Sequence, residues 1–194
     1  FGYPLELTIE LANEKGLTVD EKGFKEAFKA HQELSKAQAQ AAKGGLTERT
    51  ETTTNYHTAT HIMLAGLRKM FGTGVEQKGS NITEERLRFD FNLDHKMTSE
   101  ELTELEKFVN DVINNKIDVV KSELAYKDAV AQGAYGVFNA ESDDQIVSIY
   151  TIEGVDKQIC GGPHAKNTGD LGQFVIKKEE SSASGIRRIK AILK

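Results

Sequence analysis

The sequence predicts an α+β fold, in which helices cover a largely antiparallel sheet and a helical arm forms the N-terminus. Two segments, residues 55–71 and 98–115, repeat apolar residues every three or four positions, as amphipathic helices do. Short apolar or alternating runs predict strands, and most of these runs are joined closely enough to form hairpins. The runs occupy residues 75–82, 87–91, 118–124, 146–152, 173–178 and 186–193.

The first 45 residues have the pattern of helices with little to bury. Residues 5–15 predict a short helix, and Asp20 is placed to N-cap a longer one that reaches residue 43 and stops at Gly44 and Gly45. The second half of the longer helix is mostly Ala, Gln and Lys, which favour helix but offer little apolar surface. The chain therefore divides into a helical arm and a main domain, residues 1–45 and residues 46–194.

Local signals set the expected boundaries of the helices in the main domain. Residues 47–54 are polar and predict a linker before the first long helix. Thr98 followed by Glu101 predicts a capping box at the start of the second. A shorter helix is expected at residues 127–132.

Composition narrows the class of protein. The 194 residues suit one domain with an appendage, and 38% hydrophobic with 28% charged residues is typical of a soluble globular protein without a membrane span. Cys160 is the single cysteine, so an internal disulfide is excluded and a cytoplasmic protein is expected. The net charge of -5 means that any contact with nucleic acid depends on a local patch. Because residue 1 is Phe, we expect a fragment of a longer polypeptide.

Four residues have the pattern of a metal site. His57 and His61 are four apart in the first long helix, so both imidazoles lie on one face and can reach one ion. This face is rotated by about 100° from the apolar stripe that begins at Tyr56, so the histidines are expected to border the core. Cys160 and His164 enclose the segment C-G-G-P-H, in which glycines allow a tight turn.

Three imidazole nitrogens and one thiolate make a tetrahedral ligand set that suits zinc. Thr58 stands where H-E-x-x-H metalloproteases have their glutamate, so peptide hydrolysis by that mechanism is not expected. A site with four protein ligands can also be closed and purely structural, so the spacing leaves the function open.

Several motifs, in the same order along the chain, resemble the editing domain of alanyl-tRNA synthetases. The same zinc-ligand pattern occurs in freestanding editing proteins and in the editing module of threonyl-tRNA synthetases, but Q-K-G-S and S-G-I-R-R-I resemble only the alanyl type. Residues 1–30 resemble the end of that synthetase's tRNA-recognition domain. The motifs are H-T-A-T-H at 57–61, Q-K-G-S at 77–80, L-R-F-D-F at 87–91, C-G-G-P-H at 160–164, N-T-G at 167–169 and E-S-S-A-S-G-I-R-R-I at 180–189.

This resemblance implies a zinc-dependent aminoacyl-tRNA deacylase that hydrolyses the ester of seryl- or glycyl-tRNA(Ala) and binds the tRNA acceptor end. Gln77 matches the glutamine on which editing depends in the family, and is expected at the mouth of the metal site as a catalytic and substrate-binding residue. Cys160 is expected to act in catalysis as a metal ligand. Ser80 and Asn167 are further substrate-binding candidates, although each could equally cap or turn the backbone.

Basic residues near the C-terminus suggest where RNA would bind. Residues 173–194 hold six basic and two acidic residues, whereas residues 126–159 hold six acidic and two basic ones. This asymmetry could orient the acceptor end through phosphate contacts, or simply mark a solvated strand edge. The candidate RNA contacts are Lys78, Arg187, Arg188 and Lys190.

Three departures from the family pattern matter. The family usually has threonine where this chain has Pro163, so the local hydrogen-bond network is expected to differ. A β-barrel that normally precedes the H-T-A-T-H helix is replaced by about a dozen residues, which implies a natural short form or an engineered deletion. The aminoacylation domain and the C-terminal domain are missing, so the chain is not expected to activate alanine.

Two other interpretations stay open. The chain could be a non-catalytic tRNA-binding module in which zinc only holds the fold, or a freestanding deacylase that edits in trans.

Overall fold

The structure, a computed structural model, describes residues 5–41, 46, 48–136, 140 and 142–194, and for residues 34–41 it describes the backbone alone. Two compact units are present, Phe1–Ala42 and Lys43–Lys194. Helices and antiparallel sheets make up the second unit, so the predicted α+β class is confirmed. Among the described residues no helix is long and apolar enough to cross a membrane.

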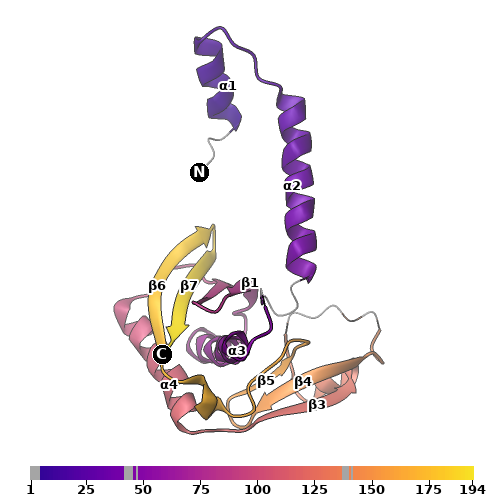
Figure 1. Ribbon diagram of the computed structural model, residues 1–194, viewed down its shortest axis with the longest axis vertical. Helices are drawn as coiled ribbons and strands as arrows, with labels where there is room; N and C mark the ends of the chain where they lie inside the picture. Colours follow the sequence, from indigo (N-terminus) through magenta and orange to yellow (C-terminus); the bar gives the residue numbers. More distant parts are fainter. Residues whose placement is uncertain (1–4, 42–45, 47, 137–139, 141) are drawn as a thin grey trace. The chain divides into compact units, whose positions relative to one another are not determined.

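The first unit consists of helices α1 (Leu5–Glu14) and α2 (Glu21–Ala41), drawn in indigo and violet in Figure 1. The predicted N-cap is confirmed, because Asp20 Oδ1 accepts a hydrogen bond of 2.9 Å from the amide of Gly23. The predicted stop at Gly44 and Gly45 lies outside the described residues.

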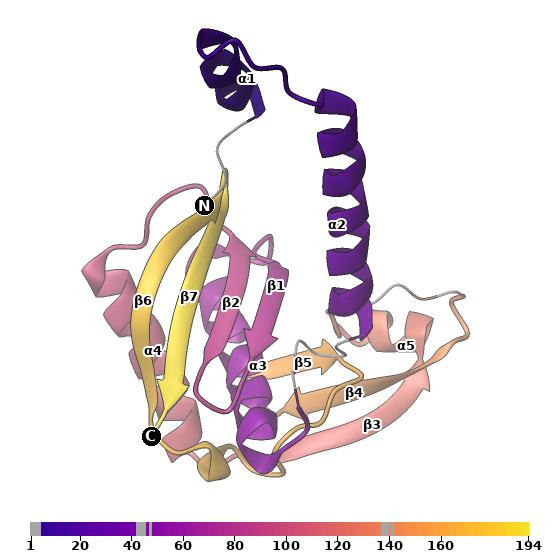
Figure 2. The ribbon, with the colours of Figure 1, turned by 45° about the horizontal axis from the view of Figure 1, so that its top comes forward.

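The second unit contains two antiparallel sheets where the sequence predicted one (Figure 2). The first has the order β1-β2-β7-β6 and the second the order β3-β4-β5. Their strands are β1 (Gln77–Ile82), β2 (Leu87–Asn92), β3 (Val119–Ala125), β4 (Ile146–Ile152), β5 (Asp156–Ile159), β6 (Phe174–Ala183) and β7 (Ile186–Leu193).

Two strand predictions need correction. Strand β5 was not predicted, because its four residues, D-K-Q-I, contain a single apolar side chain. Strand β6 was predicted to end at residue 178 but continues to Ala183, since its polar second half pairs with β7 and forms ion pairs there. Pairing between strands outweighs the local preference of this segment for a turn.

Three helices and one short turn complete the unit: α3 (Glu51–Phe71), α4 (Ser99–Asn114), α5 (Tyr126–Ala131) and the 3₁₀ turn η2 (Thr168–Leu171). The predicted capping box of α4 is confirmed by mutual hydrogen bonds between Thr98 and Glu101. The expected start of α3 at residue 55 is wrong. Thr50 and Thr53 form a capping box of their own, which brings the end of the predicted linker into the helix.

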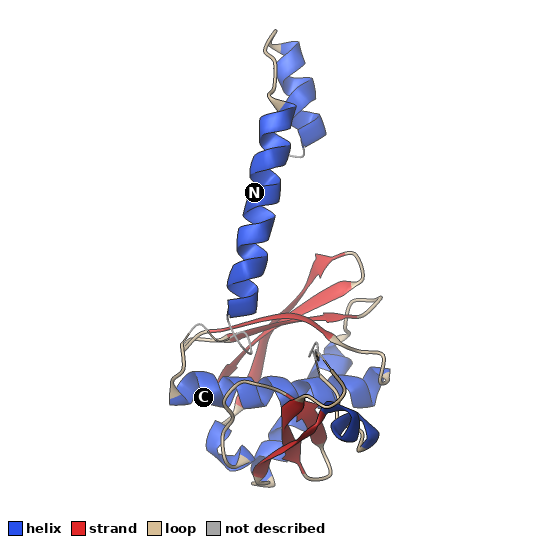
Figure 3. Cartoon of the chain, turned by 90° about the vertical axis from the view of Figure 1, so that its right-hand side faces the viewer, coloured by secondary structure: helices blue, strands red, loops and turns tan. Residues whose placement is uncertain are grey.

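Helix α3 is enclosed on all sides. It contacts β1 and β2 of one sheet, β5 of the other, and α4 (Figure 3). Every residue from Tyr56 to Leu67 is buried. Strand β5 and the segment after it cover the histidine face of α3, so His57 and His61, expected to border the core, are themselves buried, with 3% and 7% of each residue exposed.

Candidate metal centre

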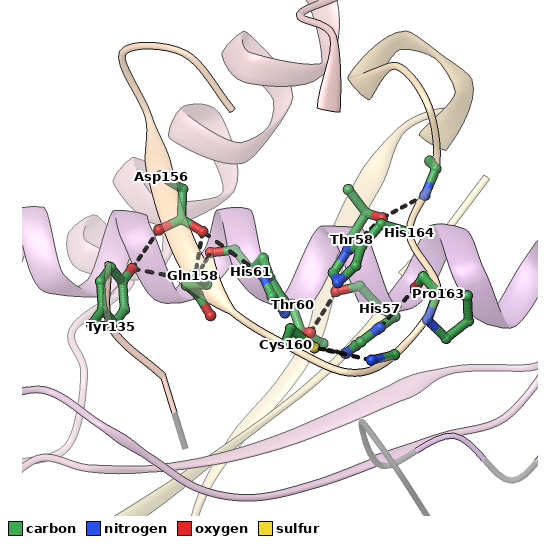
Figure 4. Close-up of polar contacts among 12 residues, drawn as sticks. His57, Thr58, Thr60, His61, Tyr135, Asp156, Gln158, Cys160, Pro163 and His164 are labelled. Carbon is green, nitrogen blue, oxygen red and sulfur yellow. Dashed lines mark hydrogen bonds and ion pairs between the residues drawn. The ribbon is translucent and has the colours of Figure 1, made fainter. Parts of the chain in front are cut away.

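The four predicted metal ligands converge on one point. His57 and His61 come from α3, Cys160 directly follows β5, and His164 lies in the segment after it (Figure 4). One ligand atom from each residue lies within 4.8 Å of the others. Cys160 Sγ lies 3.6 Å from His57 Nε2. The fold thus brings together residues that are about a hundred positions apart in sequence.

One of the two glycines between Cys160 and His164 is required for this approach. A Cβ atom at Gly162 would overlap the imidazole of His57, whereas Gly161 has open space around it. The amide of Gly162 also donates to Cys160 Sγ at 3.4 Å. Gly162 therefore lets the backbone pass directly over the histidine ring while it holds the sulfur.

Each histidine uses its Nδ1 atom for a contact outside the cluster. His57 Nδ1 lies 2.9 Å from the carbonyl oxygen of Pro163, and His164 Nδ1 lies 3.2 Å from Thr58 Oγ1. The third contact, from His61 Nδ1 to Asp156 Oδ2, is longer at 3.8 Å. Because the contact of Pro163 is made by its backbone carbonyl, proline in place of the family's threonine is compatible with it.

Thr58 determines which nitrogen of His164 carries its proton. Its hydroxyl donates to the carbonyl of Thr54 and accepts from the amide of Ala165. The remaining partner, His164 Nδ1, must then donate, which leaves Nε2 with a free lone pair. That Nε2 atom is buried and has no partner among the described residues. A buried acceptor without a partner is costly, so this atom is suited to bind a metal ion.

Burial controls the protonation of the cluster. It lowers the pKa of His57 and His61, and together with the charge of His57 it lowers the pKa of His164 to about 2. Burial also raises the pKa of the Cys160 thiol. The three imidazoles are therefore neutral and ready to bind an ion at neutral pH, while the thiol must lose its proton to do so. Three nitrogens and one sulfur at this spacing fit tetrahedral zinc.

The predicted substrate-binding residues are engaged in other contacts. Gln77 is half-buried on β1, and its amide donates to Ser80 Oγ at 3.1 Å. The side chain of Asn167 accepts from the amide of Gly169 and donates to Lys116 and Asp118, each at 2.8 Å. Asn167 thus caps the η2 turn, as its alternative interpretation holds, while the site roles of Gln77 and Ser80 stay predictions.

Each predicted RNA-contacting cation is paired with a carboxylate. Two other arginines, Arg86 and Arg88, were not singled out from the sequence, and each has one buried guanidinium nitrogen without a partner among the described residues. The pairs are Lys78–Glu76 at 2.7 Å, Arg187–Glu179 at 2.5 Å, Arg188–Asp90 at 2.7 Å and Lys190–Glu180 at 2.7 Å.

Sequence reasoning missed a buried polar network beside His61 (Figure 4). Asp156 accepts hydrogen bonds from the Tyr135 hydroxyl at 2.5 Å and from Gln158 Nε2 at 2.6 Å. Burial raises the pKa of Asp156 to about 7, although both hydrogen bonds oppose the shift. The available signal was Asp156 and Gln158 at alternate positions just before Cys160, which places both on one face if the segment is a strand.

Comparison with known proteins shows what the chain is similar to. Residues 147–190 match the family described as the threonyl and alanyl tRNA synthetase second additional domain. All 194 residues match alanine–tRNA ligases of Borrelia hermsii, with 51% identity, and of Treponema denticola, with 50% identity. The chain spans about a third (32%) of the length of both relatives.

A more distant relative differs in the extent of the match. The alanine–tRNA ligase of Pseudothermotoga lettingae is 43% identical over 145 residues, which is 75% of this chain and 17% of that relative. The complete match to the Borrelia and Treponema ligases includes the short connection before α3, which favours a natural short form over an engineered deletion. The chain is therefore related over its whole length to a segment of alanine–tRNA ligases that includes the second additional domain named for the threonyl and alanyl synthetases.

Proposed function

We propose that this chain is a zinc-dependent editing deacylase, which hydrolyses the ester of seryl- or glycyl-tRNA(Ala) in the cytoplasm. The observation that carries the proposal is the convergence of His57, His61, Cys160 and His164 within 4.8 Å, in a chain related end to end to alanine–tRNA ligases. The buried and unpartnered Nε2 of His164 supports an ion at that point.

Zinc, when bound, would polarise the ester or anchor the amino group of the charged tRNA. Cys160 and the three histidines would hold the ion and fill its tetrahedral shell. The attacking water therefore needs a group outside the ligand set to orient it. Gln77 is proposed for this role, because its amide can donate to one partner while it accepts from another. Its hydrogen bond to Ser80 would fix the amide before substrate binds.

Discrimination between amino acids is the reason for an editing site separate from the aminoacylation site of a synthetase. A single pocket cannot strongly exclude glycine, which is smaller than alanine, or serine, which adds only a hydroxyl group. A polar group that bonds the serine hydroxyl would be left unsatisfied by alanine, and correctly charged tRNA would be spared. Ser80 is the proposed substrate-binding partner beside Gln77.

We place the RNA contact on the outer face of the sheet β1-β2-β7-β6. Arg88 is paired in register with Lys190, and Asp90 with Arg188, so these side chains share the face opposite the buried Phe89. Arg187, one of the predicted RNA contacts, lies on the other face, because neighbours in a strand point to opposite sides, and the proposal leaves it out. Asp90 and Glu180 are the acidic residues that share this outer face with basic ones. The basic side chains on it are Arg86, Arg88, Lys178, Arg188 and Lys190.

A deacylation assay tests the proposed function. The zinc-loaded chain is incubated with seryl-tRNA(Ala) and, in parallel, with alanyl-tRNA(Ala), and the loss of each ester is followed. We expect rapid loss of serine and slow loss of alanine. Zinc and tRNA binding without loss of either ester would contradict the proposal and support the binding module with structural zinc. The Asn167→Ala variant is a control. The Asn167 side chain caps the η2 turn, so its loss should leave the rate of deacylation unchanged in the folded protein.

A further inference from the structure

Asp156 lies beside His61. Of the three histidines in the cluster, His61 is the one whose Nδ1 atom makes no hydrogen bond of ordinary length. His57 and His164 have close acceptors in the Pro163 carbonyl and Thr58 Oγ1, at 2.9 and 3.2 Å. His61 Nδ1 instead faces Asp156 Oδ2 at 3.8 Å, a distance that a small movement would close. The Asp156 side chain is 1% exposed, so water does not compete for this oxygen.

The neighbours of Asp156 fix the direction of its carboxylate. The Tyr135 hydroxyl donates to Oδ1, and Gln158 Nε2 donates to Oδ2. Gln158 Nε2 also lies 3.4 Å from the carbonyl oxygen of His61 and 3.2 Å from the Tyr135 hydroxyl. The guanidinium of Arg68 lies 3.9 Å above the Tyr135 ring and holds the phenol in place. The free lone pair of Oδ2 is left facing His61.

Strand β5 links this carboxylate to the ligand set. Asp156 and Gln158 point to the same side of the strand, and Cys160 follows two residues later. One short strand therefore sets the positions of a ligand and of a carboxylate against the same turn of α3. A metal-bound histidine usually donates its other ring N–H to such an outer partner, which orients the ring.

We propose that Asp156 is the positioning residue of His61, and that Tyr135 and Gln158 hold Asp156 for this task. The inference rests on the proposed zinc site and goes beyond it, because it assigns residues that orient a zinc ligand without binding the ion themselves. Asp156 has two oxygens for three donors: the Tyr135 hydroxyl, the Gln158 amide and the His61 Nδ1–H. An asparagine has the same shape but no charge and only one oxygen. Its NH₂ group would face the Tyr135 hydroxyl in one orientation, and both Gln158 Nε2 and His61 Nδ1 in the other.

The test is the zinc affinity of the Asp156→Asn variant, measured by competition with a chromophoric chelator. We expect affinity to fall about 10–100-fold, as is typical when an outer-shell partner is lost. Replacing zinc by cobalt should also give altered d–d absorption bands, which report the ligand geometry directly. The control is Asp90→Asn, since Asp90 is also a buried carboxylate, with a side chain 11% exposed, but pairs with Arg188 away from the cluster.

Two results would overturn the inference: unchanged zinc affinity in Asp156→Asn, or an equal loss in Asp90→Asn. If Asp156→Asn does not fold, Tyr135→Phe provides the second test, because it removes only the hydroxyl that holds Oδ1. Its affinity should fall by less than that of Asp156→Asn, and an unchanged value would contradict the network. Failure of the proposed zinc site is distinguishable, because the unmodified chain would then bind no zinc.

Discussion

The histidine–cysteine cluster and the outer face of the four-stranded sheet differ in whether their polar groups have partners. In the cluster, burial keeps the histidines neutral, and His164 Nε2 has no partner among the described residues. On the sheet, Arg188 is held by Asp90 through two hydrogen bonds, and Lys190 is paired with Glu180. The cluster presents a buried lone pair that can bind a cation, whereas the sheet pairs its cations with its own carboxylates.

This difference indicates what each region needs to complete it. A buried lone pair gains most from an ion, because no solvent competes and the alternative is an unsatisfied atom. An arginine or lysine in a half-exposed ion pair can replace its carboxylate partner by an RNA phosphate with little net gain in free energy. Such contacts are screened by salt, so tRNA affinity should fall as the salt concentration rises. We therefore expect changes in the cluster to have large effects and changes on the sheet to have graded ones.

The largest effect is expected for Cys160→Ala. Loss of a direct ligand should lower zinc affinity by more than the roughly 10–100-fold expected for an outer-shell partner, and should abolish loss of serine from seryl-tRNA. The affinity for uncharged tRNA should stay within a few-fold. Metal content, deacylation and tRNA binding measure the three quantities. A folded variant with full activity would remove Cys160 from the mechanism, and an unfolded one would show that zinc also holds the fold.

A loss of about 100-fold in the deacylation rate is expected for Gln77→Ala, because a positioned polar group is removed while the ion remains. Zinc content should not change. Single-turnover kinetics with seryl-tRNA(Ala) give the rate, and Ser80→Ala, which keeps the glutamine but removes its hydrogen-bond partner, should lose less. Weaker tRNA binding with an unchanged rate would make Gln77 a contact residue.

A smaller and salt-dependent effect is expected for Arg88→Ala on the sheet. If Arg88 contacts one phosphate, its removal should weaken tRNA binding and lower the slope of log affinity against log salt by about one. Titrations at several salt concentrations measure the slope. Arg187→Ala is the matched control, because Arg187 lies on the opposite face, and an equal change in both variants would contradict the assignment of the face.

The smallest effect concerns acid stability. Hydrogen bonds from Lys178 and Lys190 lower the pKa of Glu180 to about 2 in the folded protein. The unfolded chain binds this proton at a higher pH, so the stabilisation is present above the ordinary glutamate pKa and is lost as pH falls toward 2. Glu180→Gln should reduce the dependence of the unfolding free energy on pH between pH 5 and 3, as measured by urea denaturation. An unchanged dependence would show that the pairs are too exposed to matter.

Local patterns determined a good part of the molecule. Apolar periodicity and the Thr98–Glu101 box predicted α4, and the apolar runs predicted β4 and β7 with their observed bounds. The spacing of His57 and His61, together with the single cysteine, identified a set of side chains that the fold does bring together. The apolar periodicity, the capping box and the spacing within each ligand pair, His57–His61 and Cys160–His164, involve residues a few positions apart, which the sequence shows directly.

Only the tertiary structure decided what surrounds these side chains. Strand β5 exists because β4 pairs with it, and its side chains, Asp156 and Gln158, become a buried network only when packed against α3. The second sheet also turns the histidine face of α3 into interior and thereby lowers the histidine pKa values. The packing of β5 against α3 joins segments about a hundred residues apart in sequence, so no local pattern of charge or hydropathy contains that burial.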